Sequence, residues 1–100
     1  MRVVRSNWPN AVLVCEKCSR KLDGGFGPKG KTPLAKALRK YLGLKRNRKA
    51  NGGVLDVRCL KICPKGAVTV VSGMTPHEWL LVEPGTDLGE LAAILQIAPA

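Results

Sequence analysis

The four cysteines of the chain fall into two short pairs: Cys15 and Cys18, then Cys59 and Cys63. The first pair follows the apolar segment 11–14, and the second follows the apolar segment 54–57. Both segments have the length and the β-branched composition of strands. If the strands are parallel, their carboxyl ends lie at the same edge of a sheet. The sequence therefore favours a fold in which the two cysteine pairs meet at one sheet edge.

A helix is well signalled between these two strands. Residues 19–31 are polar and rich in glycine, which is typical of a loop, and Gly43 suits the end of a helix. We expect Thr32 to cap this helix and Pro33 to take its first position. Its apolar stripe recurs at every fourth residue: Leu34, Leu38 and Leu42. Basic residues elsewhere on the helix, including Arg39, are expected to face water. The order strand, loop, helix, strand predicts a parallel βαβ unit.

The remainder of the chain predicts two more strands and a second helix. Ala67–Val71 and Trp79–Val82 should form a hairpin, and the continuously apolar first strand should be covered on both faces. Asp87 offers an N-cap, with Glu90 completing a capping box. The expected stripe of this helix is Leu88, Leu91, Ala92 and Leu95. We therefore expect one α/β domain over residues 1–100, with the thioredoxin-like order β-α-β-β-β-α.

Charge is distributed unevenly along the chain. The formal net charge is +10, yet no Lys or Arg follows Lys65. Such a field favours an anionic partner. The N-terminus has no apolar signal segment, and no apolar run is long enough to cross a bilayer, so we expect a soluble, cytoplasmic protein without a membrane partner. In that compartment paired cysteines more often bind metal or react than form structural disulfides.

Three kinds of chemistry suit the cysteines. A 2Fe–2S cluster needs four thiolates, two on each iron, which the two pairs supply, and nearby cations would stabilise that anionic centre. Zinc also takes four cysteines in short pairs, which would make the chain a Cys₄ zinc-binding interaction module. Cys15-x-x-Cys18 also matches the dithiol of a thiol–disulfide oxidoreductase. That chemistry needs Cys15 at the start of a helix, whereas the convincing helix begins only near Thr32.

Gly25–Thr32 satisfies the phosphate-loop pattern G-x-x-x-x-G-K-T. We interpret the match as chance, because the loop should directly follow its strand, and Pro33 disfavours a helical conformation at Thr32. A nucleotide hydrolase also needs a magnesium-binding carboxylate and a larger domain.

The segment Cys59–Val71 resembles the second half-site of the thioredoxin-like 2Fe–2S ferredoxins. The first cysteine pair, the glycine-rich loop with its following helix, and the late segment Trp79–Leu88 resemble the same family. The resemblance implies a thioredoxin-like fold and one 2Fe–2S cluster ligated by both cysteine pairs. It also implies one-electron transfer, without enzymatic activity of its own, and commonly a homodimer. Cys15 and Cys18 lie closer together than in the family, so zinc stays an alternative.

The basic stretch 29–49 bears on the choice of partner. We expect it to be mainly a solvated surface, or else to dock a redox protein with an acidic surface. Nucleic acid is not expected as a partner, because aromatic residues that stack on bases are nearly absent from the sequence.

Overall fold

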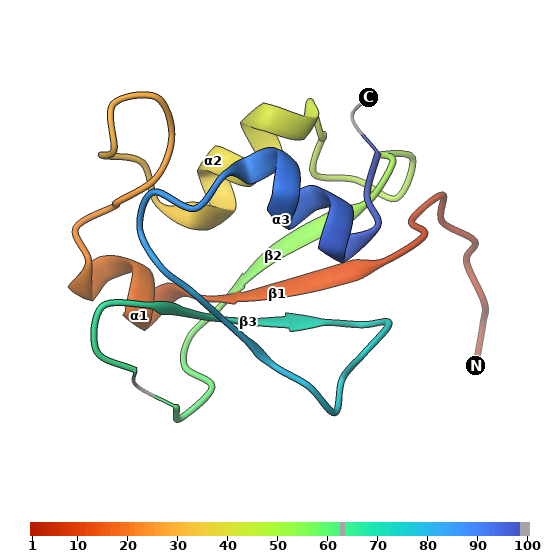
Figure 1. Cartoon of the computed structure of the whole chain (residues 1–100). Helices are drawn as coiled ribbons and strands as arrows, with labels where there is room; N and C mark the ends of the chain where they lie inside the picture. The colour runs from red at the N-terminus through yellow and green to blue at the C-terminus, as the bar shows by residue number, and fades with distance from the viewer. Residues whose placement is uncertain (63, 99–100) are drawn as a thin grey trace.

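A computed structural model describes residues 1–62 and 64–98 (Figure 1). Its strands are β1 (Ala11–Cys15), β2 (Gly53–Val57), β3 (Val68–Ser72) and β4 (Leu80–Val82). Its helices are α1 (Glu16–Lys21), α2 (Leu34–Leu42) and α3 (Leu88–Leu95). The chain forms a small α/β domain. No helix in the described ranges is long and apolar enough to cross a membrane.

The four strands form one mixed sheet in the order β2-β1-β3-β4. β1 and β2 are parallel, with Ala11 opposite Gly53 at one end and Cys15 opposite Val57 at the other. β3 is antiparallel to both β1 and β4. The parallel pair and the hairpin predicted from the sequence are therefore confirmed. Because β1 and β2 run in the same direction, the residues that follow them emerge at one edge of the sheet.

Helices α2 and α3 pack against one another and cover one face of the sheet (Figure 1). The core joins that face to the predicted helical stripes, and its fully buried members include Val12, Val14, Leu34, Leu38 and Leu95. The expectation that the first strand is covered on both faces is wrong. Leu13 is only half-buried, and its neighbour across the sheet, Leu55, is 43% exposed.

Helix α1 was not predicted, since the sequence indicated a loop from residue 19 onward. It begins directly after β1 and ends at Lys21. Six residues are too few to show a helical period, and the cap position holds a cysteine instead of a usual capping residue.

The start of α2 differs from the prediction by one position. Pro33 itself is the N-cap, with the extended conformation φ −59° and ψ 146°, and no side chain caps the helix. Thr32 instead pairs with Phe26 in a short antiparallel bridge. The end is as predicted, because Gly43 adopts the left-handed conformation that favours glycine.

Arg39 does not face water as expected. It donates a 2.8 Å hydrogen bond from Nη1 to the carbonyl oxygen of Val54, and its Nη2 lies 3.5 Å from Asp56 Oδ2. The side chain thereby connects α2 to the outer strand β2. At the other helix, Asp87 is the N-cap as predicted, and its Oδ1 accepts a 3.1 Å hydrogen bond from the Gly89 N–H.

Candidate functional site at the carboxyl ends of β1 and β2

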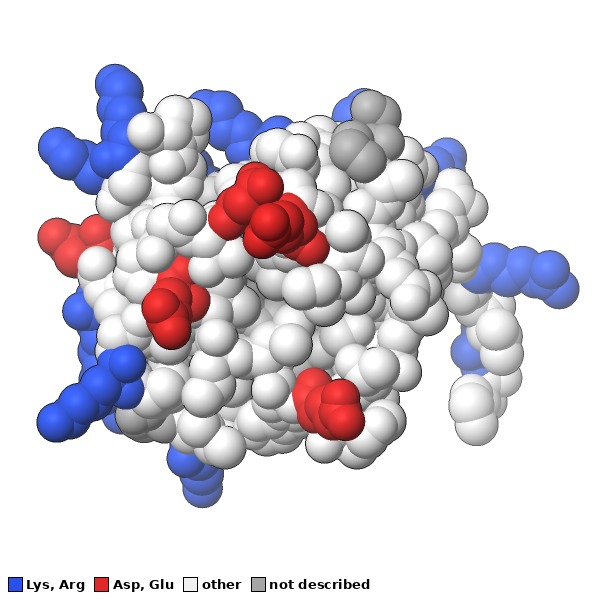
Figure 2. All heavy atoms as spheres, viewed as in Figure 1, with Lys and Arg blue, Asp and Glu red and all other residues white. Residues whose placement is uncertain are grey.

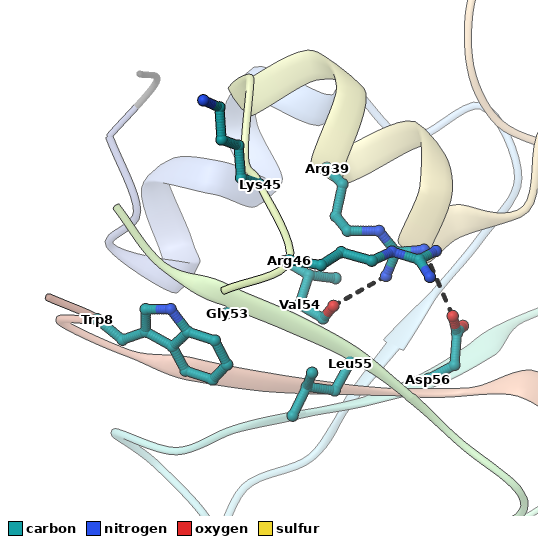
Figure 3. Close-up of a pocket in the computed structure, with 8 residues that line it drawn as sticks. All are labelled: Trp8, Arg39, Lys45, Arg46, Gly53, Val54, Leu55 and Asp56. Carbon is teal, nitrogen blue, oxygen red and sulfur yellow. Dashed lines mark hydrogen bonds and ion pairs between the residues drawn. The ribbon is translucent and has the colours of Figure 1, made fainter. Parts of the chain in front are cut away.

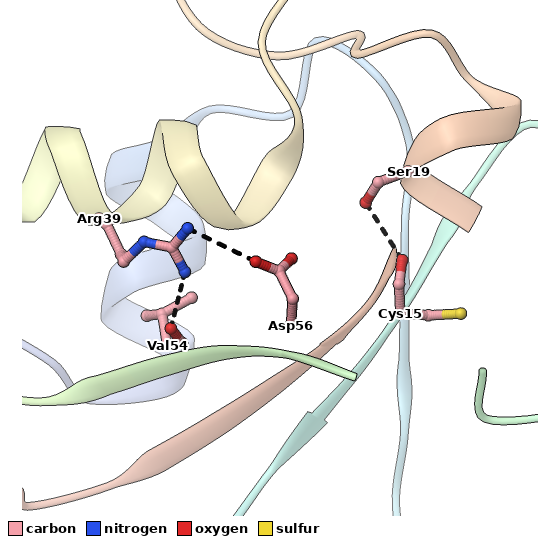
Figure 4. A network of polar contacts seen from close by, with 5 residues as sticks. All are labelled: Cys15, Ser19, Arg39, Val54 and Asp56. Atoms are coloured by element: carbon pink, nitrogen blue, oxygen red, sulfur yellow. Dashed lines mark hydrogen bonds and ion pairs between the residues drawn. The ribbon is translucent and has the colours of Figure 1, made fainter. Parts of the chain in front are cut away.

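Cys15 and Cys18 lie where β1 turns directly into α1. Cys15 is both the last residue of the strand and the N-cap of the helix, and Cys18 lies in its first turn. Both are buried, at 0% and 3% exposed. The Ser19 hydroxyl donates a 3.1 Å hydrogen bond to the Cys15 carbonyl oxygen, which holds this junction together (Figure 4). The expectation that no helix begins at Cys15 is therefore wrong.

The segment that follows β2 lies against this junction. The Lys17 N–H donates a 3.3 Å hydrogen bond to the Arg58 carbonyl oxygen. The Cys18 thiol lies 3.7 Å from the Ile62 carbonyl oxygen, to which it donates. These contacts join residues that are about forty positions apart in the sequence, and they place Cys18 beside the segment that carries the second pair.

Thr69, in strand β3, also contacts the segment that follows β2. Its side chain is fully buried, and its hydroxyl donates a 3.2 Å hydrogen bond to the same Ile62 carbonyl oxygen. The Cys18 sulfur lies 4.0 Å from the Thr69 hydroxyl. Cys18, Ile62 and Thr69 thus form one small cluster between α1, β3 and the segment after β2. Sequence reasoning treated Thr69 only as a strand residue, and nothing in its local pattern distinguishes it.

Two opposing influences set the pKa of the Cys15 thiol. Burial raises this pKa, whereas the backbone N–H groups of Cys18, Leu60 and Lys17 and the Cys18 thiol favour the thiolate and lower it. The lowering contributions prevail, and the pKa lies below its ordinary value. The Cys15 side chain makes no capping hydrogen bond to α1. Of the N–H groups that lower the pKa, that of Leu60 comes from the segment after β2.

The second cysteine pair is described only in part. Cys59 is exposed, and its sulfur accepts a 3.3 Å hydrogen bond from the Lys61 N–H. Lys61 has a positive φ of 60°, which marks a sharp bend in this segment. Cys63 lies outside the described residues. Within residues 1–62 and 64–98, no three Cys, His, Asp or Glu side chains are close enough together to hold one metal ion. The structure thus brings Cys15 and Cys18 together, with Cys59 on the adjoining segment.

The glycine-rich loop uses its own backbone groups internally. Phe26 and Thr32 exchange two hydrogen bonds of 3.0 and 2.9 Å, and the N–H groups of Gly25 and Gly30 donate to carbonyl groups within the same loop. These N–H groups are consequently not free to surround a phosphate. The geometry agrees with the interpretation of the phosphate-loop pattern as a chance match.

No protein-family model, curated protein or solved structure matches the chain.

Proposed function

We propose that the chain is a small electron-transfer protein that holds one 2Fe–2S cluster through its four cysteines: Cys15, Cys18, Cys59 and Cys63. The observation that carries this proposal is the contact between the two cysteine-bearing segments. The Leu60 N–H lies near the Cys15 sulfur, and the Ile62 carbonyl oxygen lies beside the Cys18 thiol. Two segments distant in sequence thus share one end of the sheet, as two chelating arms must.

The chemistry of the described donors suits such a cluster. Iron–sulfur clusters are ligated by cysteine thiolates. The lowered pKa of Cys15 favours the thiolate form of this residue. Backbone N–H groups directed at ligand sulfurs also stabilise added negative charge, which raises a reduction potential. Cys59 faces solvent, so ligation requires its sulfur to leave the Lys61 N–H and turn toward the first pair. When bound, the cluster would supply one-electron exchange, and the protein would supply ligation and partial shielding.

The proposal includes the thioredoxin-like arrangement of the domain. It is supported by a sheet with a parallel first pair, by an antiparallel hairpin that completes it, and by a cysteine pair at the start of the first helix. The separate helix α1 is an addition to the expected element order. A redox partner would approach the cysteine end of the molecule, where Lys17, Arg20 and Lys61 are exposed and would favour an acidic surface. A homodimer and a cytoplasmic location stay predictions.

Serine substitutions test the ligand set. The visible absorption of anaerobically reconstituted protein should be lost in Cys59→Ser as well as in Cys18→Ser, because each removes one of four ligands. Ser6→Ala, at an exposed position before β1 and away from the cysteines, is the control and should retain the spectrum. An unchanged spectrum and iron content in Cys59→Ser would contradict ligation by the second pair. Stoichiometric zinc in place of iron would favour the Cys₄ zinc module.

A second candidate function is thiol–disulfide exchange by Cys15 and Cys18. The observation that favours it is the position of Cys15 at the N-cap of α1 with a lowered pKa. The Cys15 thiolate would attack a substrate disulfide, forming a mixed disulfide and releasing one thiolate. Cys18, once deprotonated, would then attack the Cys15 sulfur, leaving an intramolecular disulfide and releasing the second substrate thiolate. We rank this function second because Cys15 is fully buried, so a protein disulfide cannot reach it without local opening.

An insulin-reduction assay separates the two functions. Thiol–disulfide exchange should require Cys15 and Cys18 but survive Cys59→Ser, whereas cluster assembly requires both pairs. Insulin reduction by the wild type that persists in Cys59→Ser would establish the second function.

A further inference from the structure

The end of the sheet opposite the cysteines carries a basic surface built from two separate stretches of the chain. Residues 45–49, in the connector between α2 and β2, read Lys-Arg-Asn-Arg-Lys. Residues 1–10 precede β1. Because Ala11 lies opposite Gly53 and Cys15 lies opposite Val57, both stretches enter the sheet at the end away from the cysteines (Figure 1). A partner bound there would be separated from the cysteine site by the length of β1.

Hydrogen bonds hold these two stretches together. The Asn7 N–H donates to the Arg48 carbonyl oxygen at 2.7 Å, and the Asn7 side-chain amide donates to the Lys49 carbonyl oxygen at 3.2 Å. The Trp8 indole Nε1–H donates to the Asn47 carbonyl oxygen at 2.9 Å. The connector backbone is thereby tied down, while the side chains of Lys45, Arg46, Arg48 and Lys49 extend from residues that are exposed.

One carboxylate lies near this surface, because Asp56 lines the same hollow as Trp8, Lys45 and Arg46 and pairs with Arg39 (Figure 3). Residues 24–55 contain no Asp or Glu. In the described parts of the chain the ion pair found is Arg39–Asp56, which leaves the four connector cations without an acidic partner there. Figure 2 shows separate acidic side chains spread over the face viewed, one of them at its left edge, with basic side chains projecting mainly around the rim. The connector thus contributes four of the cations that give the chain its formal net charge of +10.

Trp8 adds an aromatic face beside these cations. Its ring packs so closely on the backbone of Gly53 that a Cβ at that position would come within 2.2 Å of it. Trp8, Lys45 and Arg46 line a hollow of about 240 Å³ together with Arg39 of α2 and the β2 residues from Gly53 to Asp56 (Figure 3). Trp8 is half-buried as a residue and borders this hollow. The expectation that nucleic acid is not a partner was based on the scarcity of aromatic residues. It did not include Trp8 beside Lys45, because these residues are far apart along the chain.

We propose that this surface binds a single-stranded nucleic acid, with phosphates on the four connector cations and a base stacked near Trp8. Single strands bind surfaces that combine cations for the phosphates with aromatic rings for the bases. The connector presents four cations and Asn47, and the hollow beside it also includes Val54 and Leu55, so a protein with an acidic surface is the alternative that the poly-glutamate comparison below tests. The site lies away from the cysteines and does not depend on the proposed redox function.

Fluorescence anisotropy with a fluorescein-labelled single-stranded oligonucleotide of mixed sequence tests the charge contribution. Replacing Lys45, Arg46, Arg48 and Lys49 by Ala should weaken binding at least about tenfold near 0.1 M salt and lower the salt-dependence slope of log K by about 3. The control variant replaces Lys17, Arg20, Lys21 and Arg58 by Ala, removing the same charge at the cysteine end. In this control the salt-dependence slope of log K should fall by less than about 1. Equal effects of the two variants would overturn the proposal.

Trp8 fluorescence tests the stacking contribution in the intact connector. The Trp79→Phe variant leaves Trp8 as the only tryptophan. Its emission should be quenched as the oligonucleotide saturates the protein. Poly-glutamate should bind more weakly and leave the emission unchanged. Absence of quenching by the oligonucleotide, or equal affinity for poly-glutamate, would overturn the proposal and indicate a general polyanion or acidic-protein surface instead.

Discussion

At the scale of single residues, the candidate site depends on how backbone groups surround the Cys15 sulfur. The residue is fully buried, which alone would favour a neutral thiol. Its pKa is nevertheless lowered by N–H groups from its own helix and by that of Leu60 on the neighbouring segment. This combination of burial with donors aimed at the sulfur suits a ligand or a reactive thiolate better than a purely structural cysteine.

The ultraviolet thiolate absorption of the reduced protein tests the Cys15 pKa. In a Cys59→Ala/Cys63→Ala background, the first thiolate should form below the free-cysteine value of about 8.5. Adding Cys18→Ala should move that midpoint upward, because it removes the Cys18 thiol as a donor. A first midpoint at or above about 8.5 would contradict the structure.

The same lowered pKa predicts a pH dependence of stability. A thiol whose pKa is lower in the folded than in the unfolded state stabilises the fold when it is ionised. The contribution of Cys15 should be fully present above the unfolded pKa and lost as the pH falls through the folded pKa. The measurement compares the denaturant midpoints of the apo protein and of Cys15→Ser across the pH range between the folded and unfolded pKa values of Cys15. An identical pH dependence of the two proteins would contradict the account.

Thr69 should contribute to stability through a single hydrogen bond. Thr69→Val keeps the buried shape but removes the hydroxyl that donates to the Ile62 carbonyl oxygen. We expect a loss of about 0.5–1.5 kcal/mol in the free energy of unfolding. Thr69→Ser, which retains the hydroxyl, is the control for that bond. If Thr69→Val and wild type unfold at the same urea concentration, the hydroxyl does not anchor this segment.

At the scale of elements, the glycine-rich loop between α1 and α2 is closed by short internal contacts. Gly24 has φ +96°, and a Cβ there would lie 2.3 Å from the Lys31 carbonyl oxygen. Gly30 also has a positive φ, of +67°, but a Cβ there would meet nothing within 4 Å. The two glycines thus share a left-handed backbone and differ in the space around it.

This difference makes Gly24 and Gly30 a matched pair. Gly30→Ala should lower the free energy of unfolding by about 1–2 kcal/mol, because a side chain there only has to adopt the left-handed conformation. Gly24→Ala should cost more, because the backbone of Lys31 must also move. Denaturant unfolding of both variants measures the difference. Equal losses would show that the loop does not hold Gly24 against Lys31.

The sequence predicted most elements but not the one that positions Cys15. The strands were recognisable as short apolar runs, α2 by its helical periodicity, and the start of α3 by Asp87, an ordinary capping residue. Helix α1 is too short to show a period, and its start depends on tertiary contacts with the segment after β2. The role of Arg39 likewise depends on the position of β2, which helical periodicity alone does not contain.

For the candidate site, the sequence predicted that the two cysteine-bearing segments lie at the same end of the sheet, but it did not predict the positions of the individual side chains. Parallel β1 and β2 place the first cysteine pair beside the segment carrying the second, as expected. The exposed position of Cys59 was not predictable, because the path of the segment after β2, with its positive φ at Lys61, has no signature in the residue spacing. Thr69 was not recognised because its importance lies in contacts across the fold.

At the scale of the whole molecule, the sheet separates two surfaces of different chemistry. The cysteines lie at the carboxyl ends of β1 and β2, and the connector cations lie at the opposite ends. An electron-transfer partner and a nucleic acid would thus occupy different ends of the protein. Substitutions in the connector are expected to leave cluster assembly unchanged, and Cys59→Ser is expected to leave oligonucleotide affinity unchanged. Loss of both activities in either variant would contradict this separation.

Iron and acid-labile sulfide analysis of protein purified without oxygen, with its visible spectrum, tests the central claim most directly. We expect about two iron atoms and two sulfides per chain. The protein should be coloured, with visible absorption that bleaches on addition of dithionite. Colourless protein that contains zinc, or that binds no metal even after reconstitution with iron and sulfide, would contradict the cluster.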